Sequence, residues 1–434
     1  MSDAQETVRC PVHVDDVDLF GPGAQEHWYD AYPLLHRDDP VRRIPGEGTG
    51  GGTDGYILSK YDDIARVVRD PVRFPTTLTL ALQRMAGEDK PPEELPYTNA
   101  MLVSMYYLRP TNELYRAHRQ ELTDPWVGPG AARHEAMIRA HAEDLLDAVG
   151  DRDEVEFIGD FARPLPQRVM ASVLGFPAED IPQLAEWGTA QVMPFVYGKG
   201  HRNEMTQTQV EEQFRQLDGF RDYVFDAVRE KRRNPEDDMI SWLCDVEYEA
   251  LGRKLTDMEI NGIVYAMIIG GLETTQYAIE EQAQMVCEHP GLLDRLHGDR
   301  GLIRGFCEET MRLRSPTQGL STRICSQDEE FQGVKVPKGS MLHLRWAAGN
   351  VDPDEWECPY DLDIERKAVT RHLAFSQGPR VCPGAGISRL EQQIAWNCLL
   401  DRFDGMSYAD GNDFRHQPGI MLGTLELRLR VSRR

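Results

Sequence analysis

Hydrophobic spacing indicates helices along most of the chain after about residue 130. The segment Glu135–Val149 is the clearest short example, because its apolar residues recur three and four positions apart. These residues are Ile138, Ala142, Leu145, Leu146 and Val149. We expect this segment to be a helix that packs against the core along one face.

The longest helical pattern begins at Thr256 and extends to Glu288. Thr256 and Glu259 match a capping box at its start, and Pro290 prevents the helix from continuing much further. At about 1.5 Å per residue, such a helix is roughly 50 Å long, which is enough to cross a whole domain.

Three short stretches have the composition of strands: Gly55–Ser59, Phe331–Val336 and Leu425–Val431. The glycine-rich segment Gly46–Gly55 lacks the Lys-Ser/Thr pair of a phosphate-binding loop, and we interpret it as a turn. There is no internal repeat and no linker rich in Pro, Gly or Ser, so we expect one large domain. The pattern predicts a mainly α fold with small peripheral β-sheets.

The chain of 434 residues has a formal net charge of −24. Binding to nucleic acid or anionic lipid needs a basic surface, so neither partner is expected. The N-terminus is polar, without a signal peptide, and no apolar run approaches the roughly 20 residues that span a bilayer. The eight cysteines are scattered without a CxxC pair, which is typical of reduced thiols. We expect a soluble, cytoplasmic protein with no membrane contact.

One cysteine stands in a special setting. Cys382 lies within Phe375–Gly384, among glycines and prolines, directly before an apolar helical pattern. At a helix N-terminus, the helix dipole and free N–H groups favour a thiolate. A thiolate on a haem iron in turn favours O–O cleavage. A lone cysteine before a helix is more often a plain buried thiol, so the interpretation depends on its neighbours.

Those neighbours resemble the cysteine signature of the cytochrome P450 family. The segment has the restricted residues of that signature, which are Phe375, Gly378, Arg380 and Gly384 around Cys382. The resemblance implies haem b (iron protoporphyrin IX) as the cofactor, with Cys382 as the ligand of its iron and Phe375 beside it. It also implies a reaction class, monooxygenation, and a cytochrome P450 fold.

The resemblance covers the chain from about Leu19 to the C-terminus. It implies a single cytochrome P450 domain over residues 19–434, with residues 1–18 as an N-terminal tail. In that fold a long central helix passes over the haem. We expect the helical pattern that begins at Thr256 to be this helix.

A second motif is the pair Glu309 and Arg312, which lie on one face of a predicted helix. Taken alone, such a pair is most often a surface ion pair. Here Ser315-Pro316 follows it, as in the family. It resembles the ion pair that closes with Arg366 to hold the haem-binding core.

The centre of the long helix reads Gly270-Gly271-Leu272-Glu273-Thr274. Two glycines inside a helix cost about 1 kcal/mol each relative to alanine, which suggests that something approaches the backbone there. In the family this is where the helix bends over the haem, so Gly270 and Gly271 are expected beside the cofactor. Thr274 resembles the threonine that hydrogen-bonds dioxygen, and Glu273 resembles the acid that relays protons. The plainer alternatives are a back-bonded hydroxyl and a solvated helix charge.

Haem propionates need cations, and three arginines resemble the family's propionate partners by position: Arg119, Arg323 and Arg380. The first motif departs from the family pattern, because Tyr115 stands where a histidine is usual. The local alignment is therefore open by a few residues, and Arg116 competes with Arg119 for this role.

The resemblance implies insertion of one oxygen atom from O2 into an apolar small organic substrate, by hydroxylation, epoxidation or O/N-dealkylation. A haem-thiolate binding protein or gas sensor would need Cys382 but not Glu273 and Thr274, so this pair favours an enzyme. A non-haem, all-α interaction protein would lack a Soret band.

We find no flavin or iron–sulfur module after the haem region, so we expect electrons from a ferredoxin and its ferredoxin reductase. A local basic patch at Arg116, Arg119 and Arg380 suits an acidic ferredoxin, although propionates compete for these charges.

The walls of the substrate pocket are placed by family position alone. By family position its walls are rich in Leu, Met, Phe and Tyr, which predicts an apolar substrate, although each stretch is equally compatible with ordinary core. These segments are Leu78–Tyr107, Gln191–Tyr197, Thr317–Thr322 and Ile420–Leu422.

Overall fold

The computed structural model describes residues 9–49, 52–76, 108–196, 198–199, 202–319, 322–417 and 419–433. It is mainly helical with small sheets, as the hydrophobic pattern predicts. No helix in the described ranges is both long and apolar enough to cross a bilayer.

The α-helices are α1 (Trp28–Asp38), α2 (Tyr61–Arg69), α5 (Asn112–His118), α6 (Glu135–Val149), α7 (Pro164–Leu174), α8 (Ile181–Val196), α9 (Gln207–Arg233), α10 (Met239–Asp245), α11 (Asp257–Gly271), α12 (Thr274–Glu288), α13 (Leu292–Gly298), α14 (Ile303–Leu313), α15 (Trp346–Gly349) and α16 (Ala385–Arg402). The helix predicted over Glu135–Val149 is confirmed as α6, with the five expected apolar residues buried.

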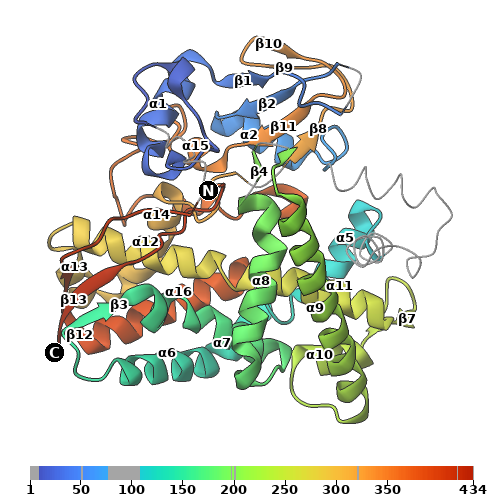
Figure 1. Cartoon of the computed structure of the whole chain (residues 1–434), viewed down its shortest axis with the longest axis vertical. Coiled ribbons are helices and arrows are strands. Elements are labelled where there is room, and N and C mark those ends of the chain that lie inside the picture. Colours follow the sequence, from blue (N-terminus) through green and yellow to red (C-terminus); the bar gives the residue numbers. More distant parts are fainter. Residues whose placement is uncertain are drawn as a thin grey trace.

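The strands form several small sheets. Their bounds are β1 (Val41–Ile44), β2 (Gly55–Leu58), β3 (Glu154–Glu156), β4 (Gly198–Lys199), β5 (Arg202–Asn203), β6 (Glu247–Tyr248), β7 (Arg253–Lys254), β8 (Thr322–Ile324), β9 (Glu329–Phe331), β10 (Val334–Val336), β11 (Met341–Leu344), β12 (Phe403–Tyr408) and β13 (Arg428–Arg433). The largest sheet has the order β1-β2-β11-β8, and a second has the order β12-β13-β3. In the first, β2 and β11 run parallel although far apart in the sequence. The sheet that contains β1, β2, β11 and β8 lies at one end of the molecule, together with α1, α2 and α15, whereas β3, β12 and β13 lie beside the helices at the other end (Figure 1).

The strand prediction at Gly55–Ser59 is confirmed by β2, but the other two need correction. The stretch Phe331–Val336 is a hairpin rather than one strand, because Gln332 and Gly333 turn the chain with φ of 48° and 77° between β9 and β10. The last strand begins at Arg428, so Leu425 is not part of it.

The long helix predicted from Thr256 to Glu288 is present in two parts, with an interruption where the resemblance places a bend. The capping box at Thr256 is present, but α11 ends at Gly271 and α12 begins at Thr274. Thr274 Oγ1 donates to the carbonyl oxygen of Gly270 at 2.8 Å, in competition with the helical N–H ladder. A Cβ at Gly271 would overlap Met170 of α7, so the break lies where two helices approach closely.

The largest cluster of buried hydrophobic residues includes α16 and residues of many other helices, whereas α2 packs in a second cluster with the four-stranded sheet. Trp396 of α16 is fully buried, and the ring of Phe306 from α14 meets it edge-on at 5.0 Å. In Figure 1, α16 runs between α12 and α6. The helix that follows Cys382 is therefore held in the middle of the domain rather than at its surface.

The predicted ion pair is confirmed inside this core. Arg312 donates to both carboxylate oxygens of Glu309, at 2.8 and 2.7 Å, and Arg366 Nε donates to Glu309 Oε1 at 2.9 Å. The side chains of Glu309 and Arg312 are both 0% exposed. Arg312 also donates to the carbonyl oxygens of Asn350 and Pro359. The group therefore ties α14 to the irregular segment that leads toward Cys382.

We predict that Glu309→Gln lowers the free energy of unfolding by about 3–5 kcal/mol, because it leaves the buried Arg312 without a counter-charge. Urea denaturation followed by circular dichroism measures this loss. The control is Glu365→Gln, since Glu365 pairs with Arg295 at the surface, where ion pairs contribute little. Equal effects of the two substitutions would contradict the structural role of Glu309.

Candidate active site

The loop that presents Cys382 is shaped by backbone contacts. The N–H of Cys382 donates to the carbonyl oxygen of Phe375 at 2.8 Å, which closes the loop. Gly378 has φ of 71°, and a Cβ there would lie 2.8 Å from the carbonyl oxygen of Val68. Only glycine satisfies both conditions without strain, because the left-handed conformation and the close approach coincide. The loop therefore lies directly against the end of α2.

The other side of the loop is fixed by the first turn of α16. The N–H of Ile387 donates to the carbonyl oxygen of Val127 at 2.9 Å. A Cβ on Gly386 would overlap the backbone of Gly128, so the two segments touch backbone to backbone. The position of Cys382 is consequently set from both directions along the chain.

The Cys382 thiol lies among apolar groups and close to backbone N–H donors. It packs near Ala278, Met311 and Phe375. Burial raises the pKa of Cys382, while the backbone N–H groups of Gly384 and Ala385 and the charge of Arg119 act to lower it. Such donors, together with a metal ion, stabilise a thiolate. The thiol is therefore suited to bind a metal.

Four arginines gather next to this loop. Arg109 and Arg380 lie over the ring of Tyr115, at 5.3 and 4.4 Å from its centroid. Burial and the charge of Arg380 lower the pKa of Arg323 to about 10. Burial and the charges of Arg380 and Arg119 also lower the pKa of Arg109.

Within the described ranges, Arg109, Arg323 and Arg380 have no carboxylate partner. Arg323 is buried, and Arg109 and Arg380 are half-buried. Cations withdrawn from water without counter-charges are costly, so this cluster is suited to anions. Two carboxylates at this place would satisfy it.

The structure also separates the two candidates of the Tyr115 motif. Arg119 donates to the carbonyl oxygen of Val381 at 2.7 Å and pairs with Asp124 at 3.1 Å. Arg116 is exposed. Arg119 is therefore the candidate that contacts the Cys382 loop, and its contact with the cofactor stays a prediction.

Two members of the cluster were missed by the sequence analysis, Arg109 and His118. His118 is 1% exposed, and neither ring nitrogen has a hydrogen-bond partner among the described residues. Burial and the charges of Arg109 and Arg119 lower its pKa well below the usual range. His118 is thus a neutral imidazole with a free donor beside the arginines. The spacing of His118 directly before Arg119 was the only sequence signal for it.

Glu273 and Thr274, the predicted acid and alcohol, lie at the break between α11 and α12. Gly270 is exposed, and a Cβ there would meet nothing within 4 Å, whereas Glu273 and Thr274 are half-buried. Thr275 Oγ1 donates to Ser388 Oγ of α16 at 2.9 Å, which fixes the break relative to the Cys382 loop. Glu273 Oε2 accepts from the hydroxyl of Tyr277 at 2.8 Å.

The predicted pocket walls are described only in part. The whole segment Leu78–Tyr107 lies outside the described residues, and so do Tyr197, Leu320 and Ser321. Two of the remaining segments are brought together, because Thr317 and Met421 form an isolated antiparallel bridge. Buried Tyr277 packs with Ile420 and Met421, next to the helix break.

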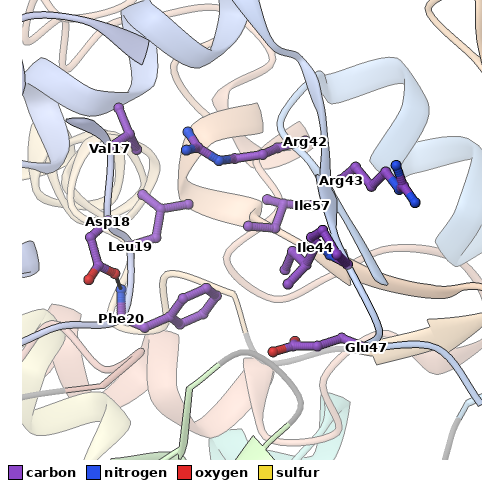
Figure 2. Close-up of a pocket in the computed structure, with 10 residues that line it drawn as sticks. Val17, Asp18, Leu19, Phe20, Arg42, Arg43, Ile44, Glu47 and Ile57 are labelled. Carbon is purple, nitrogen blue, oxygen red and sulfur yellow. Dashed lines mark hydrogen bonds between the residues drawn. The ribbon is translucent and has the colours of Figure 1, made fainter. Parts of the chain in front are cut away.

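Two further hollows in the protein differ in their relation to the predicted site residues. Figure 2 shows a pocket of about 330 Å³ between residues 17–20 and the β1–β2 hairpin, with Phe20 and Ile57 among the side chains that line it. None of the predicted site residues lines it. A depression of about 630 Å³ lies beside the Cys382 loop and is lined by Phe375 and Val381.

Comparisons with known proteins agree with this geometry. The family model described as Cytochrome P450 matches residues 203–431. The biotin biosynthesis cytochrome P450 of Bacillus subtilis (strain 168) is 32% identical over 399 residues, which cover 92% of this chain and 94% of that protein.

Two solved structures show the same fold. P450BioI in complex with hexadec-9Z-enoic acid ligated acyl carrier protein has 27% identity and a TM-score of 0.78, covering 94% of this chain and 98% of that one. Epothilone B-bound cytochrome P450epoK has 24% identity and a TM-score of 0.81, covering 96% and 99%.

The fold and the comparisons together define an oxidoreductase that uses haem. The chain belongs to the cytochrome P450 family, and it is a monooxygenase with haem b as its cofactor. The residues present fit this cofactor, because the Cys382 thiol adjoins Arg323 and Arg380, which have no carboxylate partner among the described residues. The propionates of haem b supply two such carboxylates.

We predict that the dithionite-reduced holoprotein with carbon monoxide shows the shifted Soret band after which the family is named. Cys382→Ala should abolish this band or the bound haem, because it removes the thiolate ligand. Cys358→Ala is the matched control, since Cys358 is a free, exposed cysteine outside the loop. An unchanged band in Cys382→Ala would assign the iron ligand to another residue.

Proposed function

We propose that this chain inserts one oxygen atom from O2 into an apolar small organic substrate, with Cys382 as the iron ligand. The observation that carries the proposal is the bond from Thr275 to Ser388, because it positions the acid and alcohol of the helix break against the helix that follows Cys382. When bound, haem b supplies the redox chemistry that activates dioxygen.

Glu273 and Thr274 have the proton-handling role in this proposal. Splitting an O–O bond to release water consumes two protons, which a positioned acid delivers. Burial raises the pKa of Glu273, so it keeps its proton to a higher pH than an exposed carboxyl. Thr274 is its neighbour in the chain and has the hydroxyl that passes a proton onward.

The arginine cluster has the role of holding the cofactor. Arg119, Arg323 and Arg380 are the proposed partners of the propionates, with Arg109 as a further member. Gly270, Gly271 and Phe375 are proposed to lie beside the ring. Each guanidinium provides a forked set of N–H donors that matches a carboxylate.

The substrate is proposed to be apolar because of the pocket walls. Of these, Ile420 and Met421 pack with Tyr277 into an apolar cluster near the break. The solved relative P450BioI holds a hexadec-9Z-enoic acyl chain on a carrier protein, which is consistent with this class. A spectral-shift screen of the ferric protein with fatty acids, steroids, terpenoids and aryl ethers identifies the compound that binds.

Electrons are proposed to come from a ferredoxin and its reductase, in the cytoplasm. All eight cysteines are free thiols, which suits a reducing compartment. The depression beside the Cys382 loop is lined by Arg69, Arg304, Arg371 and Arg389 and by no carboxylate of the described residues. In a chain with a net charge of −24 this is a local basic surface, which attracts an acidic protein.

We predict that Thr274→Ala retains substrate binding but diverts electrons to hydrogen peroxide, because the proton no longer arrives. Glu273→Gln should have the same effect and also remove a pH dependence. In the wild type, coupling falls as the pH rises through the pKa of Glu273, since the acid then loses its proton. Both predictions are tested by measuring, across pH, the amounts of product and of peroxide formed per NADPH consumed. Unchanged coupling in both variants would refute the proton-handling roles of Glu273 and Thr274.

We predict that Arg69→Glu and Arg304→Glu each raise the KM for a plant-type [2Fe–2S] ferredoxin about tenfold or more at low salt, with little change in CO binding. The effect should shrink as salt screens the charges. Arg229→Glu is the control, because Arg229 is an exposed residue of α9 that pairs with Asp226. Equal KM values for all three variants would place the docking surface elsewhere.

A further inference from the structure

A polar cavity of about 330 Å³ lies on the side of the helix break where Glu273 is found. It is enclosed by α8, the start of α7, the break itself and the segment after residue 416. Its polar lining includes Arg163, Glu186, Glu273, Tyr277 and Gln417. Arg163, Glu186 and Leu425 are exposed, so the cavity opens to solvent. Thr274 does not line it.

Tyr277 holds the carboxylate of Glu273 in this cavity. Its hydroxyl donates to Glu273 Oε2 at 2.8 Å and accepts from Gln417 Nε2 at 2.8 Å. Its ring is 5% exposed, and a Cβ on Gly423 would lie 2.6 Å from the ring atom Cε1. The orientation of the hydroxyl is thus determined by packing on one side and by an amide donor on the other.

We propose that Tyr277 is a positioning residue that keeps the Glu273 carboxylate in the solvent-open cavity, where it is reprotonated between its deliveries to Thr274. This inference rests on the proposed function of Glu273. One proton passes from bulk water through cavity water to a carboxylate oxygen of Glu273, and Glu273 later gives a proton to Thr274 Oγ1 while the Thr274 hydroxyl releases its own proton toward the reacting oxygen. No electron moves in this exchange, and Glu273 returns to its starting charge.

The charges around Glu273 support a positioning role. Burial raises the pKa of Glu273, whereas the hydrogen bond from Tyr277 and the charge of Arg163 act to lower it. Glu186 faces the cavity from α8, and Glu280 is the next acid along α12. Burial and the charge of Glu273 raise the pKa of Tyr277 far above its usual range. Tyr277 therefore remains a donor and does not itself titrate.

The first test measures the protonation of Glu273 directly. Infrared difference spectra of the ferric holoprotein, recorded across pH, contain the C=O band of the protonated carboxyl, which Glu273→Gln identifies by its loss. Tyr277→Phe removes the donor that favours the charged form, so this band should persist to higher pH. Tyr408→Phe is the matched control, because Tyr408 donates to Glu288 at 2.8 Å on the same helix. An unmoved midpoint in Tyr277→Phe overturns the inference.

The second test measures proton delivery during turnover, with the compound that gives the largest spectral shift in the screen. Tyr277→Phe should release more peroxide per NADPH than wild type and show a larger solvent deuterium isotope effect. Combining it with Glu273→Gln should add nothing to Glu273→Gln alone, because Tyr277 acts through Glu273. Gln417→Leu, which removes the amide donor, should have a smaller effect in the same direction.

Outcomes separate this inference from the proposal on which it rests. If Glu273→Gln leaves coupling unchanged, the role of Glu273 fails and the inference fails with it. If Glu273→Gln lowers coupling while Tyr277→Phe matches wild type, the inference alone is overturned. Additive effects in the double variant would likewise show that Tyr277 acts by another route.

Discussion

The placement of the Cys382 loop is the constraint on which the rest of the structure depends. It is set by backbone contacts at two glycines, Gly378 against Val68 and Gly386 against Gly128. Contacts between backbones do not change with side-chain rotamers, so they hold a ligand more rigidly than side-chain packing alone. The helix that follows then enters the core, and the buried group of Glu309 and its arginines secures the segment before it.

The break between α11 and α12 gives up helical hydrogen bonds at a place where residues of the site lie. Helical hydrogen bonding is interrupted there, and Thr274 satisfies the carbonyl of Gly270 with its side chain instead. Tertiary contacts offset this cost, because α7 packs against Gly271 and Thr275 is bonded to α16. Glu273 lines the outer cavity, whereas its neighbour Thr274 does not.

Positive charge is concentrated beside the Cys382 loop in a chain that is acidic as a whole. Arg109 and Arg323 repel Arg380, and the lowered pKa of Arg323, at about 10, expresses this repulsion together with burial. Carboxylates bound there relieve it, so cofactor binding and folding stability are expected to be linked. The arginines that line the adjoining depression extend this positive charge to the surface. One concentration of cations thus serves the proposed cofactor contacts and the proposed electron donor.

The sequence by itself determined the features that depend on neighbours along the chain: α6, the cap at Thr256, the Cys382 motif and the pairing of Glu309 with Arg312. Spacing and short motifs carry this information, because the groups involved lie within a few residues of one another. Only the tertiary structure decided the contacts that hold the helix break, the hairpin of β9 and β10, the inclusion of His118 in the arginine cluster and the bond from Tyr277 to Glu273. The hairpin depends on a turn at Gln332, whose positive φ the sequence pattern does not reveal. The other features depend on segments that meet only after folding, such as Gln417 with α12.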